Sequence, residues 1–347
     1  MPIRFMKSKI IAGLLAFSAL QGCQKVSNIG KDNDTVILTP HTVIASTDEG
    51  WLVKTNDGRT FNSMFPPDGY AASMVSAAGS NVIMLKSRIF YSDNNGKNFN
   101  PSTYTNYNPK PWRYWVFDCP AHKRTYMAST IGNGVAYSED GGITWKEDTA
   151  WQANTSPNVK ITSFAQLQSN AVFAFNDDYN VLYRRDNVTD NWNAVVVEGV
   201  FPSASAYFLT SNNTDLFIVD YNGFGGAWYS LNEGVNWTKF GIGSLPVSGT
   251  EKFVGAASGA SGTLAIATEN DVYYANTNSS FQKANTGLDI GTKIYGITAK
   301  YNVYKNGNRV NFLYIATSKG IYRSDDNGFA WDKVSFNQFN TAYTAIY

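Results

Sequence analysis

A short motif recurs along the chain at intervals of 38 to 50 residues, and this repeat constrains the fold more than any other feature. Each clear copy has a strand-like run, a polar residue, a glycine two positions later and then a large aromatic residue, as in YSEDGGITW (137–145), and two decayed copies, at 185–192 and 274–281, lack the glycine. Intervals close to 45 residues are typical of a β-propeller, in which each repeat supplies one four-stranded blade. The central polar residues of the seven copies are Asn56, Asn94, Asp140, Asn187, Asn232, Asn276 and Asp326.

The chemistry of the motif predicts a tight turn at the rim of each blade. Such a turn leaves backbone N–H groups without a strand partner, and an Asp or Asn side chain can accept their hydrogen bonds. The glycine supplies a positive φ, and the aromatic ring can fill the gap between neighbouring blades. No copy has the ligand spacing of a calcium loop, so we predict a structural role for the motif rather than a catalytic or metal-binding one.

The motif resembles the Asp-box, S-x-D-x-G-x-T-W, and the copy from Ser138 to Trp145 fits every position. Asp-box propellers include sialidases, sortilin-type receptors, xyloglucanases and the photosystem II stability/assembly factor family. The last family is the most similar in architecture, because it is also a single seven-bladed propeller and often a lipoprotein, although its basic arginine patch has no counterpart here. The resemblance implies an all-β fold with one seven-bladed propeller over residues 35–347, and it says little about function.

The last blade can be divided into strands. We predict strands at 292–299, 311–318, 320–325 and 331–336. The C-terminal segment NTAYTAIY (340–347) resembles a further inner strand, which would complete the first blade, close the ring and remove an exposed sheet edge. The segment TVILTP (35–40) competes for the same place.

The N-terminal segment predicts export and lipidation. Three basic residues precede the apolar run 10–20, as in a secretory signal peptide of residues 1–22. The sequence LQGC (20–23) resembles a bacterial lipobox with Cys23 as the lipidated residue; the alternative is a plain secretory signal with a chance cysteine. Residues 23–34 are polar and are expected to form a tether. Because Gln24 rather than Asp follows the cysteine, resemblance to lipoproteins of two-membraned bacteria implies the outer membrane.

Charge and cysteine content limit the possible partners. Residues 1–22 carry three of the 28 basic residues and none of the 27 acidic ones, so the mature chain is nearly neutral and nucleic-acid binding is not expected. With Cys23 lipidated, Cys119 has no partner for an intramolecular disulfide. We expect no cofactor and no metal.

Candidate catalytic groups are few. In Asp-box propellers the boxed turns lie on one face of the ring, and ligands usually bind the opposite face. A sialidase needs three converging arginines, whereas Arg88 and Arg113 alone are expected to reach that opposite face, so sialidase activity is not expected. Asp118, Cys119 and His122 are close in sequence, and we interpret them as a surface turn on the boxed face rather than a nucleophilic or metal site.

The acidic residues of the turns between second and third strands leave a glycosidase open, because this chemistry needs only two carboxylates. The candidates are Asp48, Glu49, Asp177, Asp178, Asp220 and Glu269. We favour the interpretation that these are ordinary solvated turn residues.

An aromatic stretch at 104–118 is the predicted connection into the inner strand of the third blade, with Trp115 and Phe117 expected in the core. The candidate ligand-face residues are Trp112, Arg113, Tyr114, Tyr221, Phe224 and Arg88, which could form a binding surface or pack over the channel mouth. We therefore predict a non-catalytic binding or assembly propeller that engages a protein partner. The alternative is a propeller that binds or hydrolyses a glycan.

Overall fold

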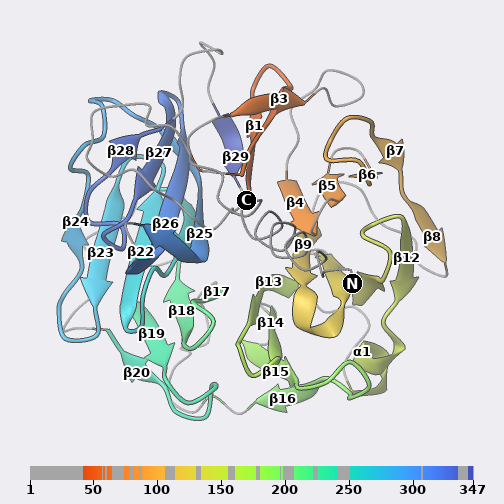
Figure 1. The fold of residues 1–347 in the computed structure, drawn as a ribbon. Coiled ribbons are helices and arrows are strands. Elements are labelled where there is room, and N and C mark those ends of the chain that lie inside the picture. The colour runs from red at the N-terminus through yellow and green to blue at the C-terminus, as the bar shows by residue number, and fades with distance from the viewer. Residues whose placement is uncertain are drawn as a thin grey trace, which may run out of the picture.

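The computed structural model describes residues 42–346 apart from 57, 59–60, 65–73, 79–80, 86–87, 106–113, 130–133, 155–160, 177–179, 196, 198–206, 222–225, 241–250, 306–307 and 335–342. The chain forms seven sheets, antiparallel except for the added strand of blade 3, and they are arranged in a ring, as Figure 1 shows. The predicted seven-bladed, all-β propeller is therefore confirmed. The predicted signal peptide and tether lie outside the described residues.

The strands of each blade follow one another from the channel to the rim. Blade 1 contains β29 (Tyr343–Ile346), β1 (Val43–Thr47), β2 (Leu52–Thr55) and β3 (Asn62–Met64). Blade 2 contains β4 (Met74–Ala78), β5 (Asn81–Leu85), β6 (Ile89–Ser92) and β7 (Asn100–Pro101). Blade 3 contains β9 (Tyr114–Cys119), β10 (Arg124–Ser129), β11 (Val135–Ser138) and β12 (Thr144–Glu147), with β8 (Thr103–Thr105) as an added outer strand. Blades 4 and 5 contain β13 (Ile161–Gln166), β14 (Val172–Asn176), β15 (Val181–Arg185), β16 (Asn193–Val195); and β17 (Tyr207–Ser211), β18 (Leu216–Asp220), β19 (Gly226–Ser230), β20 (Thr238–Lys239). Blades 6 and 7 contain β21 (Phe253–Ala257), β22 (Thr263–Thr268), β23 (Val272–Asn276), β24 (Gln282–Lys283); and β25 (Ile294–Lys305), β26 (Asn308–Thr317), β27 (Gly320–Ser324), β28 (Asp332–Lys333).

Burial explains the composition of the strands. The second strands are covered on both faces by neighbouring blades, so they are continuous apolar runs such as Val172–Asn176, whose residues are all buried. The outer strands are short and exposed, as in β20, β24 and β28. Short outer strands limit the length of sheet edge that is open to unwanted pairing.

The C-terminal strand closes the ring as predicted. β29 pairs antiparallel with β1, with Ala45 opposite Ile346 and Ser46 opposite Ala345. The first blade thus combines the last strand of the chain with three strands from its beginning (Figure 1). The competing segment 35–40 lies outside the described residues.

The well-preserved Asp-box turns have the expected hydrogen bonds. In blade 3 the Ser138 hydroxyl accepts the Gly142 N–H at 2.8 Å, and Asp140 accepts the Thr144 N–H at 2.8 Å. The copies around Asn94, Asn232 and Asp326 repeat this pattern with N–O distances of 2.8 to 3.1 Å. Trp145 is fully buried in a cluster that joins blades 2 and 3, as its predicted packing between blades requires.

The less well-preserved box turns are held by different hydrogen bonds. In blade 4 Asn187 donates to Asp190 through its backbone N–H at 2.9 Å and its amide at 2.8 Å, so Asp190 is the acceptor there. Asn276 accepts the nearby Asn278 N–H at 3.0 Å, and its own N–H donates to Ser279 Oγ at 3.0 Å. Asn56 accepts from the Thr42 hydroxyl at 3.2 Å.

Three elements differ from the sequence-based expectation. Residues 103–105 form β8, which pairs parallel with β12 at the rim, although the sequence suggested one long connection toward the channel. A helix, α1 (Thr149–Asn154), follows β12, and Asp148 accepts the Ala150 N–H at its start. In the last blade β25 extends to Lys305 rather than ending at 299, because it pairs with β26 as far as Lys305 opposite Asn308.

Candidate functional site

The central channel contains a cavity of about 580 Å³, lined by the innermost strands of blade 1 and blades 3 to 7. Each inner strand begins at the ligand face and ends at the boxed face, because its turn to the second strand lies beside the box turns. Arg124, which follows the turn between β9 and β10, shows this directly by pairing with Glu139 of a box turn at 2.7 Å. Residues early in an inner strand therefore lie toward the ligand face.

A series of aromatic rings leads from the ligand face into this cavity. Tyr221, in the turn after β18, stacks on Phe253 of β21 with ring centroids 5.0 Å apart and an interplanar angle of 20°. Phe253 packs in turn against Phe208 of β17 at 5.4 Å, and Phe208 lines the cavity. Tyr295 lines it from blade 7 and keeps 39% of its surface exposed. These four rings form what we call the aromatic lip.

The boxed-face end of the channel is bridged by the long hairpin of blade 7. The Tyr301 hydroxyl donates to the Ser211 carbonyl oxygen of blade 5 at 2.6 Å. Val303, two residues further on, packs against Val43 and Ala45 of blade 1. This bridge links blade 7 to blades 5 and 1 at the boxed-face end of the channel.

Two titratable groups line the inner part of the cavity, Asp118 at the end of β9 and Lys300 on β25. Burial raises the pKa of Asp118 to about 6, against the hydrogen bond from Thr125 and the charge of Lys300. Burial lowers the pKa of Lys300 to about 8, against the attraction of Asp118. Both groups are therefore mostly charged near pH 7, and each stabilises the charge of the other.

The turn with Cys119 and His122 lies on the boxed face as expected, with Pro120 and Lys123 exposed, but the two side chains are not on the surface, which corrects that part of the sequence interpretation. Both side chains are buried, and His122 Nε2 lies 3.3 Å from the Asp186 carbonyl oxygen. A carbonyl can only accept, so Nε2 carries the proton and Nδ1 accepts from the Tyr126 hydroxyl at 2.8 Å. Burial lowers the pKa of His122 and raises that of Cys119 to about 11. Such a thiol is a poor nucleophile at neutral pH, and these residues tie blade 3 to blade 4.

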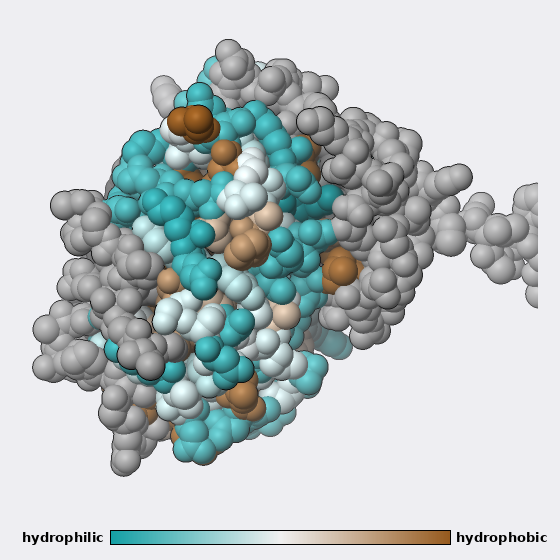
Figure 2. Space-filling model, turned by 90° about the vertical axis from the view of Figure 1, so that its left-hand side faces the viewer, coloured by the Kyte–Doolittle hydropathy of each residue, from teal (hydrophilic) through white to brown (hydrophobic). Residues whose placement is uncertain are grey.

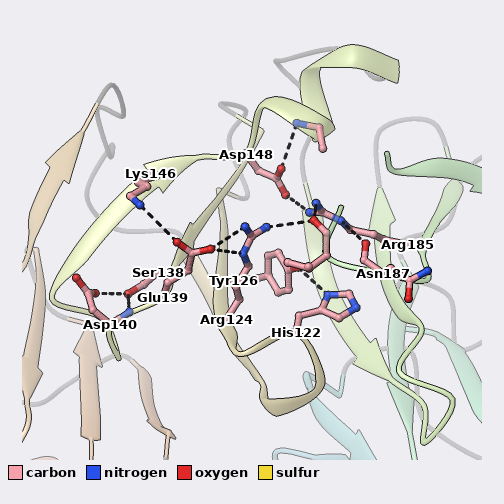
Figure 3. A network of polar contacts seen from close by, with 12 residues as sticks. His122, Arg124, Tyr126, Ser138, Glu139, Asp140, Lys146, Asp148, Arg185 and Asn187 are labelled. Atoms are coloured by element: carbon pink, nitrogen blue, oxygen red, sulfur yellow. Dashed lines mark hydrogen bonds and ion pairs between the residues drawn. The ribbon is translucent and has the colours of Figure 1, made fainter. Parts of the chain in front are cut away.

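The boxed face is joined by polar contacts between blades (Figure 3). Asp148 of blade 3 forms a buried ion pair with Arg185 of blade 4 at 2.8 Å and accepts from Trp192 Nε1 at 3.0 Å. Arg184 of blade 4 forms a further ion pair with Glu233 of blade 5 at 2.7 Å. These arginines serve structural contacts on the face opposite the aromatic lip.

The structure describes only some of the candidate binding residues. Trp112, Arg113 and Phe224 lie outside the described residues, as do the carboxylates Asp177 and Asp178. Tyr114 begins β9 at the ligand-face end of the channel. Arg88 is exposed beside the turn between β5 and β6, with its guanidinium 5.3 Å from the centre of the Phe90 ring.

Several cavity residues escaped sequence reasoning. Phe117, expected in the core, is half-buried and lines the cavity, where it stacks on Phe164 at 5.8 Å. Phe208, Phe253, Asp118 and Lys300 were not recognised as a group, because their closeness depends on the ring bringing distant inner strands together. The usable signal was their position within predicted inner strands.

The rim contrasts with the channel. Figure 2 shows the side with the outer strands of blades 6 and 7 as a largely hydrophilic surface with scattered single hydrophobic residues. Within the described part of the chain, no helix is long and apolar enough to cross a membrane. The same part contains no group of three or more His, Cys, Asp or Glu side chains placed to hold a metal ion.

The comparisons with known proteins agree with this architecture. Residues 136–147 match the BNR/Asp-box repeat. The chain is a seven-bladed β-propeller that carries an Asp-box repeat. No curated protein matches its sequence.

Solved structures with this fold include proteins of different activities. YCF48 bound to D1 peptide is 12% identical with a TM-score of 0.53, and the match covers 90% of this chain and 99% of that one. Virginiamycin B lyase from Staphylococcus aureus, a catalytically inactive variant with quinupristin, is 16% identical with a TM-score of 0.55 over 84% and 94% of the two chains. An ancestral GH74 enzyme is also 16% identical with a TM-score of 0.55, and the match covers 77% of this chain but 39% of that enzyme. At these identities the likeness establishes the fold alone.

Proposed function

We propose that this propeller is a non-catalytic binding protein that takes a segment of a protein partner at the ligand-face entrance of its channel. The observation that carries the proposal is the aromatic lip above a cavity of about 580 Å³. Specific binding pockets are typically of this size, with apolar and aromatic walls and few polar groups. Aromatic residues also dominate the energetics of protein interfaces. That YCF48, with the same fold, has been solved with a bound peptide supports this choice.

The glycan alternative has less support from the cavity. Retaining hydrolysis requires two carboxylates about 5–5.5 Å apart, and Asp118 is the one carboxylate among the described residues of the lining. The similarity of this chain to the ancestral GH74 enzyme is a similarity of fold.

The proposal includes a place in the cell. We propose that a lipid on Cys23 holds the propeller at the envelope of a two-membraned bacterium, with residues 23–34 as the tether. A tethered disc with an outward-facing pocket suits the capture or assembly of another envelope protein. The lipidation motif at 20–23 supports this placement.

A peptide array tests the proposed function. The full chain is screened against random decapeptides, and bound sequences are measured by calorimetry with the wild type, Tyr221→Ala and Phe329→Ala. Phe329 is the matched control, because it is a 48% exposed aromatic residue in a boxed turn. We expect Tyr221→Ala to weaken binding at least tenfold, as loss of an interface aromatic residue costs more than about 1 kcal/mol, and Phe329→Ala to leave it unchanged.

Two results would overturn this function. One is a folded protein that binds no peptide, and the other is equal weakening by the two substitutions. A glycan array run in parallel tests the alternative ligand class. If a glycan binds and Tyr221→Ala weakens its binding, the proposed ligand becomes a glycan in place of a protein partner.

A further inference from the structure

The channel pocket carries two opposite charges in a lining of mixed apolar and uncharged polar side chains. Asp118 accepts the Thr125 hydroxyl at 3.3 Å, and its carboxylate interacts electrostatically with the Lys300 ammonium. Protein atoms surround Lys300, yet its side chain keeps partial access to the channel. The two groups together contribute no net charge, so they favour neither a cationic nor an anionic ligand.

Apolar side chains line parts of the same cavity. Phe117 and Phe164 are stacked with an interplanar angle of 19° and line one side of the cavity. Val254 and Ile297 line it from blades 6 and 7. A flat apolar group fits such walls, because aromatic rings favour stacked or edge-to-face contacts with other rings.

The two features define a ligand with an aromatic body and a neutral head that both donates and accepts hydrogen bonds. We propose that the pocket binds a phenol group, such as the tyrosine side chain of a partner peptide, with the ring between the apolar walls and the hydroxyl at Asp118 and Lys300. The hydroxyl donates to the carboxylate and accepts from the ammonium, which has three N–H groups and can bind it in addition to a protein group. This inference rests on the proposed function for its partner, and names the side chain that the same site selects.

Charged heads fit the pocket less well. A carboxylate at the inner end would meet Asp118, and an amine would meet Lys300, and like charges in a poorly solvated site repel strongly. A ring without a hydroxyl would remove water from both charged groups and return no hydrogen bond. The pocket should therefore rank phenol above its charged and unsubstituted analogues.

Small fluorinated probes test this ranking directly. Binding of 4-fluorophenol, fluorobenzene, 4-fluorobenzoate and 4-fluorobenzylamine to the full chain is followed by fluorine NMR titration. We expect 4-fluorophenol to bind at least tenfold more tightly than each of the other three. Equal affinity for fluorobenzene, tighter binding of either charged probe, or no binding of any probe to the folded protein would overturn the inference.

Variants locate the binding. Lys300→Met and Asp118→Asn should each weaken the binding of 4-fluorophenol at least tenfold without weakening the binding of fluorobenzene. Circular dichroism establishes that both variants are folded. Lys319→Met is the matched control, since Lys319 is exposed in the turn between β26 and β27, and it should change neither probe. An unchanged phenol affinity in both cavity variants would place the probe elsewhere and overturn the inference.

The peptides from the array separate this inference from the proposed function. For a peptide that depends on Tyr221, replacing its tyrosine by phenylalanine should weaken binding at least tenfold. If such peptides bind but contain no tyrosine, or tolerate this replacement, the inference fails while the proposed function stands.

Discussion

Single residues decide whether the box turns can form, and Gly142 shows why a glycine is needed. Its φ is +92°, a region that L-residues rarely adopt. A Cβ at this position would also lie 2.8 Å from Ile83 Cγ1 of the preceding blade. The glycine therefore allows both the backbone turn and the close approach of two blades.

Substituting this glycine should destabilise the protein for both reasons. We expect Gly142→Ala to lower the free energy of unfolding by about 2–5 kcal/mol, from backbone strain of about 1–2 kcal/mol and overpacking of about 1–3 kcal/mol. Gly291→Ala is the control, because Gly291 has φ +73° and a Cβ added there would meet no atom within 4 Å, so only the strain applies. Urea unfolding measures the free energy of unfolding of both variants. Equal losses of stability in the two would show that the contact between blades does not contribute.

At the scale of elements, neighbouring blades are held together by apolar clusters and by a few buried polar contacts. The Asp148–Arg185 pair joins the segment between β12 and α1 to β15, and both side chains are almost completely buried. Arg185 stands where the well-preserved boxes have serine, so blade 4 has replaced a turn hydrogen bond by a contact between blades. Removing one partner would leave the other charge buried without its counterion.

We expect Asp148→Asn to lower the free energy of unfolding by about 3–5 kcal/mol, the range for breaking a buried ion pair. Glu139→Gln is the control, since it weakens the more exposed pair with Arg124, and such pairs contribute about 0–1 kcal/mol. The double substitution Asp148→Leu with Arg185→Met should recover most of the loss, because it removes both charges. The free energies of unfolding are measured by equilibrium denaturation. A smaller loss of stability for Asp148→Asn than for Glu139→Gln would refute the stabilising role of the buried ion pair.

At the scale of the whole molecule, the ring depends on the pairing of β29 with β1, which joins the two ends of the propeller. Deleting residues 342–347 should expose the edge of β1 and the cluster in which Ile346 packs with Val43 and Val303. We expect a lower midpoint of thermal unfolding and loss of peptide binding, with partial recovery on addition of a synthetic 340–347 peptide. Deletion of Tyr347 alone is the control and should leave the midpoint nearly unchanged, whereas an equal effect of both deletions would contradict closure by β29.

The sequence by itself determined the architecture, because its signals are local and repeated. The polar residue, glycine and aromatic residue of each clear box act within one turn and on the neighbouring blade, so seven copies at a steady spacing indicated seven blades and a closing strand. The role of Asn187 and the burial of the Cys119 and His122 side chains were misjudged, since Asp190 replaces the box acceptor and His122 packs toward blade 4. These outcomes depend on neighbours that the local pattern does not contain.

Only the tertiary structure decided the candidate site. Asp118 and Lys300 are 182 positions apart, and Tyr221, Phe253 and Phe208 come from two blades, so their closeness follows from the curvature of the closed ring. The hairpin of blade 7 adds the Tyr301 bridge to Ser211, which no periodicity within either strand predicts. A repeated turn can specify a propeller one blade at a time, but a channel pocket exists only when all the inner strands face one another.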